Sequence, residues 1–191
     1  MFIIRGKVVT PHGIIDNGEI LVDKERIVKI GKVEKYFPLV EVFDIPKSVV
    51  VPGFIDIHMH GLGKYGPKGE ENIIGISCLE PHYGTTGFIP TLACATHHEY
   101  LKFLQDVKEA IKHQPEKGGK ILGAHLEGPY INPAMKGGMD ERYLRLPRAE
   151  EYQELIRVGG KYLKIMTLSP ELTGSIDLIK SLRKNGTVAS I

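Results

Sequence analysis

From residue 49 onward, apolar stretches alternate with helical stretches, and this alternation restricts the fold more than any other feature. Strands are expected at 49–58, 85–92, 119–127, 162–168 and 186–191, and helices at 71–83, 97–113, 149–158 and 174–184. The expected strands are continuously apolar, which is typical of strands covered on both faces. Strands that recur about every 35 residues with helices between them are βαβ units, which predict a parallel sheet with right-handed crossovers.

Two of the expected helices have recognisable faces or ends. Apolar side chains recur at helical spacing within 97–113, which predicts an amphipathic helix; they are Tyr100, Leu101, Leu104, Val107 and Ile111. The stretch 174–184 starts with Gly174-Ser175 and is followed by Asn185-Gly186, residue types that start and stop helices.

Residues 1–48 have a different texture and predict a separate β unit. Short alternating or β-branched stretches are separated by turn residues, namely Pro11-His12-Gly13, Asp16-Asn17-Gly18 and Lys24-Glu25-Arg26. This pattern predicts a small antiparallel unit, which must pack on something because it buries little surface alone. We therefore expect a small β unit at 1–48, which the family resemblance given below implies to be a β-sandwich portion, and a second domain at 49–191.

The number of expected strands indicates part of a barrel. A complete (β/α)8 TIM barrel needs eight strands and about 250 residues, more than residues 49–191 supply. The chain stops at Ile191, inside an expected strand, and a sheet that ends there has an exposed edge. We therefore expect an α/β fold in which a (β/α)8 barrel is truncated after about five strands.

Composition excludes several classes of partner. The net charge is +2 and no basic block stands out, so charge favours neither nucleic acid nor an anionic membrane as a partner. No apolar stretch is long enough for a transmembrane helix, and the first residues lack the features of a signal peptide. The two cysteines, Cys78 and Cys94, are expected to be reduced thiols in the core of a cytoplasmic protein.

Two histidines end the first strand of the expected barrel, in the stretch VVPGFIDIHMHG. His58 and His60 are two positions apart, so on a strand their side chains point to the same face. Two imidazoles at the carboxyl end of a barrel strand can grip one metal ion, although a pair of hydrogen-bonded core histidines has the same spacing. Asp56 precedes them on that face and is expected to be a structural carboxylate with a hydrogen-bond partner.

A carboxylate ends the third expected strand. Glu127 is followed by Gly128-Pro129, which stops the strand. A buried carboxylate requires a cation or hydrogen-bond donors, so Glu127 is a candidate metal ligand. His125 lies one layer deeper on the same face, where packing and hydrogen bonding are favoured over ligation. No function is expected for the other histidines, and no motif for nucleotide binding or serine hydrolysis is present.

Three motifs together resemble one family. They are P-G-F-I-D-x-H-x-H-G, Y-G-T-T-x-F-x-P-T and H-L-E-G-P-Y-x-N-P-x-x-K-G. Their order and spacing are similar to those of the N-acetylglucosamine-6-phosphate deacetylase family, in the amidohydrolase superfamily. The H-x-H-G motif marks the superfamily and H-L-E-G-P narrows it to the deacetylases. The resemblance runs through the whole chain and corresponds to the N-terminal half of the family.

The resemblance implies a metal-dependent hydrolase that removes the N-acetyl group from an amino-sugar phosphate, working as a cytoplasmic homodimer. By motif position, Glu127 is the metal-binding glutamate, and His58 and His60 complete a second position in members with two ions. The expected cofactor is a divalent metal, zinc or iron, as one or two ions. Gly138 and Met139 fall where the family has its K-G-A-H substrate contact, but Met139 replaces the histidine.

The resemblance also implies residues that this stretch of sequence does not contain. Two further metal-binding histidines are expected after the fifth and sixth strands, and the catalytic aspartate on the eighth, all beyond Ile191. The 191-residue chain is therefore expected to have little or no deacetylase activity alone. Two alternatives stay open: part of another amidohydrolase, such as a cyclic amidase or deaminase, and a non-enzymatic half-barrel that associates with a partner.

Overall fold

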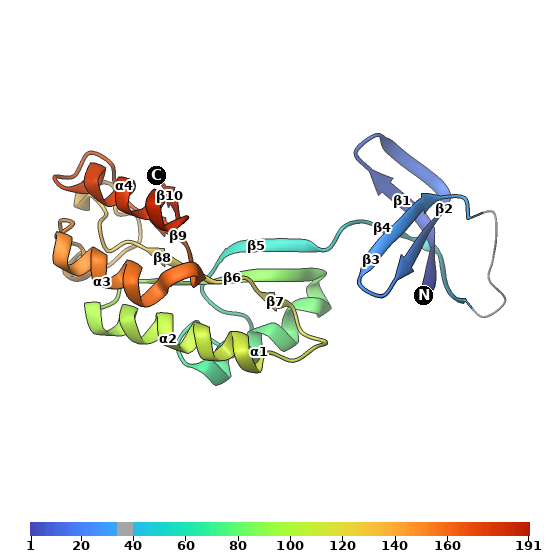
Figure 1. Ribbon diagram of the computed structural model, residues 1–191, viewed down its shortest axis with the longest axis horizontal. Coiled ribbons are helices and arrows are strands. Elements are labelled where there is room, and N and C mark those ends of the chain that lie inside the picture. Colours follow the sequence, from blue (N-terminus) through green and yellow to red (C-terminus); the bar gives the residue numbers. More distant parts are fainter. Residues whose placement is uncertain (34–39) are drawn as a thin grey trace. The chain divides into compact units, whose positions relative to one another are not determined.

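The fold is described from a computed structural model, which covers residues 1–33 and 40–191. The contacts of the backbone divide the chain into two compact units, Met1–Pro52 and Gly53–Ile191. Each unit is built around its own sheet (Figure 1). Among the described helices, none combines the length and apolarity that a membrane crossing requires.

The first unit is a four-stranded sheet in the order β3-β2-β1-β4. Its strands are β1 (Phe2–Thr10), β2 (Gly13–Asp23), β3 (Arg26–Gly31) and β4 (Glu41–Val50). Hairpins join β1 to β2 and β2 to β3, but β4 pairs with β1 in parallel. The prediction of a purely antiparallel unit was therefore wrong, because turn residues specify only the pairing of strands that are neighbours in sequence.

One of the three expected turns is also wrong. Asp16-Asn17-Gly18 lies inside β2, opposite a shift in register between Gly6 and Val8 of β1. Asn17 has a φ of 52°, a left-handed conformation that asparagine tolerates. The group of polar residues therefore marks a β-bulge rather than a chain reversal.

The second unit is a curved, parallel half-barrel with strand order β10-β9-β8-β6-β5, and β7 pairs with the amino end of β6. The strands are β5 (Phe54–Met59), β6 (Thr85–Ala93), β7 (Lys120–Ile121), β8 (Ala124–Glu127), β9 (Leu163–Thr167) and β10 (Val188–Ser190). The helices are α1 (Glu70–Leu79), α2 (His97–His113), α3 (Ala149–Gly159) and α4 (Ser175–Asn185). Short 3-10 turns are η1 (Glu80–Tyr83), η2 (Pro133–Met135), η3 (Glu141–Tyr143) and η4 (Gly160–Tyr162). The predicted alternation of parallel strands and helices is confirmed.

Two expected strands are interrupted. Residues 49 and 50 of the expected strand 49–58 belong to β4, and the barrel strand β5 begins only at Phe54. The expected strand 119–127 is split into β7 and β8 around Gly123, whose φ of 151° suits glycine alone. A Cβ at Gly123 would lie 2.5 Å from the carbonyl oxygen of Tyr162, so the break also depends on close backbone approach.

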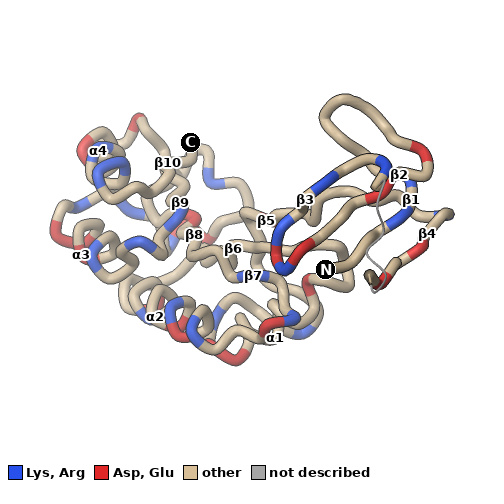
Figure 2. The backbone as a smooth tube through the Cα atoms, turned by 45° about the vertical axis from the view of Figure 1, so that its right-hand side comes forward, with Lys and Arg blue, Asp and Glu red and all other residues tan. Residues whose placement is uncertain are grey.

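The helices cover one side of the parallel sheet, and the apolar face of α2 is central to the core (Figure 1). Tyr100, Leu104 and Val107 are each at most 1% exposed, as the helical spacing predicted. Helix α2 begins at a capping box, in which the side chains of Thr96 and Glu99 satisfy each other's backbone N–H groups. Charged residues lie along the outer faces of the helices (Figure 2).

The cysteines are not core residues. Cys78 on α1 is exposed, and Cys94 is half-buried directly after β6. Neither is paired in a disulfide. The prediction of two buried thiols was wrong because Cys94 lies where the chain leaves the sheet, with a φ of 50°.

Candidate metal centre

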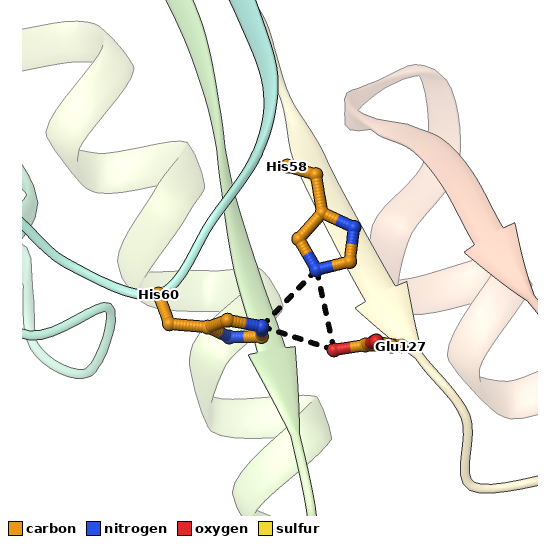
Figure 3. A group of neighbouring side chains, drawn as sticks. All are labelled: His58, His60 and Glu127. Atoms are coloured by element: carbon orange, nitrogen blue, oxygen red, sulfur yellow. Dashed lines mark hydrogen bonds and ion pairs between the residues drawn. The ribbon is translucent and has the colours of Figure 1, made fainter. Parts of the chain in front are cut away.

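Three predicted ligands meet at the carboxyl edge of the parallel sheet. His58 is in β5, His60 directly follows that strand, and Glu127 is the last residue of β8. Strand β6 lies between β5 and β8, so the three side chains reach across it from both sides. Figure 3 shows the two imidazoles and the carboxylate turned toward one another.

The three donor atoms form a tight triangle. His58 Nε2 lies 3.3 Å and His60 Nε2 lies 3.0 Å from Glu127 Oε2. The two Nε2 atoms are 3.1 Å apart. Among the residues that the structure describes, this is the one group of histidine, cysteine or carboxylate donors close enough to hold an ion.

The donor set fits a divalent transition metal. Bonds of about 2.0–2.1 Å place the ligands of a tetrahedral zinc ion roughly 3.4 Å apart, close to the separations in this triangle. Two imidazoles and one carboxylate suit zinc and iron alike. The histidine side chains are 43% and 51% exposed, so the open side of the cluster is accessible to a substrate or water. Three protein ligands with an open position are typical of a catalytic rather than a structural site.

The backbone fixes the orientation of His60. Its Nδ1 atom lies 3.1 Å from the carbonyl oxygen of Thr91. Because a carbonyl only accepts hydrogen bonds, Nδ1 carries the proton and Nε2 presents its lone pair to the cluster. This arrangement, in which the second ring nitrogen is held by another group, is the usual support of a metal-binding histidine.

Asp56 has the structural role that was predicted for it. Its Oδ1 atom accepts a hydrogen bond of 3.0 Å from the backbone N–H of His58, although the residue is half-buried rather than buried. The Asp56 carboxylate therefore fixes the backbone at His58 by a hydrogen bond.

His125 lies deeper and is held by hydrogen bonds. It is 3% exposed, its Nε2 lies 2.8 Å from Thr167 Oγ1, and its Nδ1 lies 3.2 Å from the carbonyl oxygen of Ile57. Burial, with a smaller contribution from nearby His58, lowers the pKa of His125 to about 4. The ring packs edge-on against His58, with centroids 4.9 Å apart. The packing and hydrogen-bonding role predicted for His125 is confirmed.

The segment after β8 is tied to the ends of neighbouring strands. The backbone N–H of Ser169 donates to the carbonyl of Tyr130 at 2.9 Å, and the Asn132 side chain donates to Glu171 at 2.7 Å. The backbone N–H of Asp140 contacts Cys94 Sγ at 3.3 Å. These contacts hold the segment along the carboxyl edge, on the same edge as the cluster.

The two residues expected at the substrate contact lie in a turn of this segment. The backbone N–H of Met139 donates to the carbonyl of Lys136 at 3.0 Å, and Lys136 Nζ donates back to the carbonyl of Met139 at 3.1 Å. Gly138 is exposed, and a Cβ there would meet no atom within 4 Å. The backbone of Gly138 is thus accessible, and its contact with a substrate stays a prediction, as does that of Met139.

Sequence reasoning missed two residues that support the cluster. Thr91 is fully buried in β6 and contacts both His60 and His125. Tyr100 of α2 donates its hydroxyl to the carbonyl of Glu127 at 3.3 Å, and burial raises the pKa of that hydroxyl. Both residues lie in apolar stretches that the sequence pattern assigned to the core. The hydroxyl groups of Thr91 and Tyr100 were the only sequence signal for a supporting role.

Comparisons with known proteins point in one direction. No family model matches the sequence. N-acetylglucosamine-6-phosphate deacetylase of Bacillus subtilis is 29% identical over 191 residues, which cover 96% of this chain and 48% of that enzyme. The human enzyme of the same name is 30% identical over 155 residues, covering 78% of this chain and 37% of that enzyme.

Solved structures agree with these relatives. N-acetylglucosamine-6-phosphate deacetylase from Thermotoga maritima superposes with a TM-score of 0.81 at 28% identity, covering 99% of this chain and 48% of that one. The enzyme from Mycobacterium smegmatis, at 22% identity, superposes with a TM-score of 0.84 and shows the same fold. The chain spans about half the length of the relatives it matches.

Together, the parallel half-barrel and its superposition on these structures define the chain as part of a barrel of the (β/α)8 class. Within that class, the resemblance to N-acetylglucosamine-6-phosphate deacetylase is confirmed, over about half of that enzyme's length. The expectation of a barrel truncated after about five strands agrees with the strand order and with this coverage.

Proposed function

We propose that His58, His60 and Glu127 bind one divalent metal ion and form part of the active site of an N-acetylglucosamine-6-phosphate deacetylase. The observation that carries the proposal is the convergence of three donor atoms, all within 3.3 Å of one another, from two strands that flank β6. Two imidazoles and one carboxylate are also ligand types that zinc and iron bind.

The residues of the chain prepare this site in complementary ways. Glu127 supplies a carboxylate ligand beside two imidazole ligands, and a carboxylate reduces the net charge of a bound divalent cation. His60 is held in one tautomer by the carbonyl of Thr91, so its Nε2 lone pair faces the cluster. When bound, the ion supplies Lewis acidity that activates water and polarises an amide carbonyl.

The proposed substrate is an amino-sugar phosphate, N-acetylglucosamine 6-phosphate, and the products are glucosamine 6-phosphate and acetate. Support comes from the names of the relatives and from the motifs that the chain shares with that family. In the turn 136–139, the backbone at Gly138 is open to a sugar hydroxyl. Met139 has a thioether in place of a histidine ring, so it offers an apolar contact instead of a hydrogen-bond donor.

The metal, the assembly and the compartment follow from the resemblance alone. We propose zinc or iron as the ion, with one ion held by the three ligands and a second only if further ligands are supplied. We also propose a homodimer and a cytoplasmic location. Catalysis needs a general base, and the resemblance places this aspartate and two more histidine ligands beyond Ile191. The isolated chain should therefore have little or no deacetylase activity, and hydrolysis of N-acetylglucosamine 6-phosphate at an enzyme-like rate would contradict this.

A zinc titration of the metal-stripped chain tests the ligand assignment. Competition with a chromophoric chelator should show one site, and its affinity should fall at least about 100-fold in Glu127→Gln, His58→Ala or His60→Ala, because each removes one of three ligands. His82→Asn removes an exposed histidine from η1 and serves as the matched control, with affinity expected to match wild type. Equal affinity in the ligand variants and the control would overturn the proposed site.

A further inference from the structure

We propose that Thr91 is a positioning residue. It stabilises a local break in the pairing of β5 with β6 and thereby orients the side chains of His58 and His60 toward Glu127. The inference rests on the proposed metal site, since the aim of the imidazoles matters only if they bind an ion together. It assigns a role to a buried threonine that touches neither the open side of the cluster nor the carboxylate.

The break lies where the two histidines are. Asp56 pairs with Phe88 and Met59 pairs with Pro90, so β5 advances by three residues while β6 advances by two. One extra residue on one strand is a β-bulge, and bulges beside active sites redirect side chains. Pairing resumes at Met59 and Pro90, so the break is confined to the residues around His58.

Side chains add hydrogen bonds to the backbone along the break. The backbone N–H of His58 donates to Asp56 Oδ1 at 3.0 Å. The backbone N–H of Met59, between the two histidines, donates to Thr91 Oγ1 at 3.1 Å. Met59 is 8% exposed, so removal of the hydroxyl takes a hydrogen bond away from a buried N–H, which is unfavourable.

Thr91 joins both sides of the break. Its hydroxyl lies 3.3 Å from His125 Nδ1 and its carbonyl oxygen lies 3.1 Å from His60 Nδ1. His125 Nδ1 in turn lies 3.2 Å from the carbonyl of Ile57, at the start of the break. One fully buried residue therefore contacts the second histidine, the residue before it, and the histidine that supports the stretch from below.

Three variants separate this role from general stability. Thr91→Val keeps the shape of the side chain and removes the hydroxyl, whereas Thr91→Ser keeps the hydroxyl. Thr187→Val removes an equally buried hydroxyl elsewhere in the same unit, where Thr187 is 3% exposed and donates to the carbonyl of Leu163 at 2.8 Å. The zinc affinity of each metal-stripped full chain is measured by competition with a chelator.

Zinc affinity should fall about 10- to 100-fold in Thr91→Val, as for other groups that orient metal ligands. It should stay within about threefold of wild type in Thr91→Ser, which keeps the hydroxyl. The same is expected of Thr187→Val, which lowers the stability of the fold but leaves the orientation of His58 and His60 unchanged. If wild type binds zinc and Thr91→Val binds it equally well, the assignment of Thr91 is overturned while the metal site stands. If wild type itself binds no zinc, the proposed function fails and the inference falls with it.

A measurement on the wild-type chain covers the case in which Thr91→Val does not fold. Hydrogen exchange followed by NMR should find the Met59 amide protected, because its buried N–H donates to the hydroxyl of Thr91. An amide of Met59 that exchanges as fast as those of exposed loops would overturn the inference, because the hydroxyl of Thr91 would then not hold it.

Discussion

The glycine after the second histidine offers a sharp test of how the site is built. Gly61 has a φ of 140°, and a Cβ placed there would lie 2.4 Å from the carbonyl oxygen of Tyr65. That oxygen accepts the backbone N–H of Leu62 at 2.9 Å, so it cannot move away without losing a hydrogen bond. The substitution Gly61→Ala therefore combines a strained backbone with a collision.

The magnitude follows from these two effects. A non-glycine residue in a sparsely populated φ region costs about 1–3 kcal/mol. Loss of the Leu62 to Tyr65 hydrogen bond adds about 0.5–1.5 kcal/mol. The free energy of unfolding should therefore fall by about 1.5–4.5 kcal/mol, measured by urea denaturation followed by circular dichroism. Zinc affinity should fall as well, because Gly61 adjoins His60.

Two other glycines separate the contributions. Gly137 has a φ of 57°, and a Cβ placed there would meet nothing within 4 Å, so Gly137→Ala measures backbone strain alone, about 1–2 kcal/mol. Gly66 lies in the same loop as Gly61, has no positive φ and also has open space, so Gly66→Ala should change stability by less than about 0.5 kcal/mol. If Gly61→Ala unfolds at the same urea concentration as Gly66→Ala, the reasoning is refuted.

Three further predictions concern a pKa, a thiol and a hydroxyl. The pKa of Glu99 is lowered to about 2, chiefly by its hydrogen bond from Lys68 and next by the backbone N–H of Thr96. The stability that the Glu99 carboxylate contributes is present above pH 4.5 and is lost as the pH falls through about 2. In thermal melts at decreasing pH, the stability advantage of wild type over Glu99→Gln should therefore shrink over that range, and a constant difference would contradict the capping role. Because the carboxylate is largely exposed, this advantage should be below about 1 kcal/mol. Exposed Cys78 should react with a disulfide reagent faster than half-buried Cys94, as mass spectrometry of time points would show, and the reverse order would contradict the burial of the two thiols. Tyr100→Phe should lower the free energy of unfolding by about 0.5–1.5 kcal/mol in urea denaturation, and an unchanged value would show that the hydroxyl's bond to Glu127 contributes nothing.

Features that depend on residues close together in the sequence were predictable. Helix α2 begins at His97 and ends at His113, as expected, because the capping box and the apolar spacing are both local. The meeting of His58, His60 and Glu127 was also expected, since strand periodicity gives the face and parallel strands share a carboxyl edge.

Features that depend on register between distant strands were not predictable. The parallel pairing of β1 with β4 joins segments about 40 residues apart, and no turn residue encodes it. The break in β5 depends on which residue of β6 lies opposite Met59, and Thr91 takes its role only from that alignment. Burial of the thiols was misjudged for a related reason, because Cys94 lies where the strand has already ended.

X-ray absorption at the zinc edge tests the central claim, that two histidines and one glutamate of this chain bind one metal ion. The zinc-loaded wild-type chain should show two imidazole ligands and oxygen ligands at about 2.0–2.1 Å. In Glu127→Gln the bound zinc should keep the signal of two imidazoles, and in the double variant His58→Ala, His60→Ala that signal should disappear. Imidazole ligands that persist in the double variant, or a wild-type spectrum without them, would contradict the account.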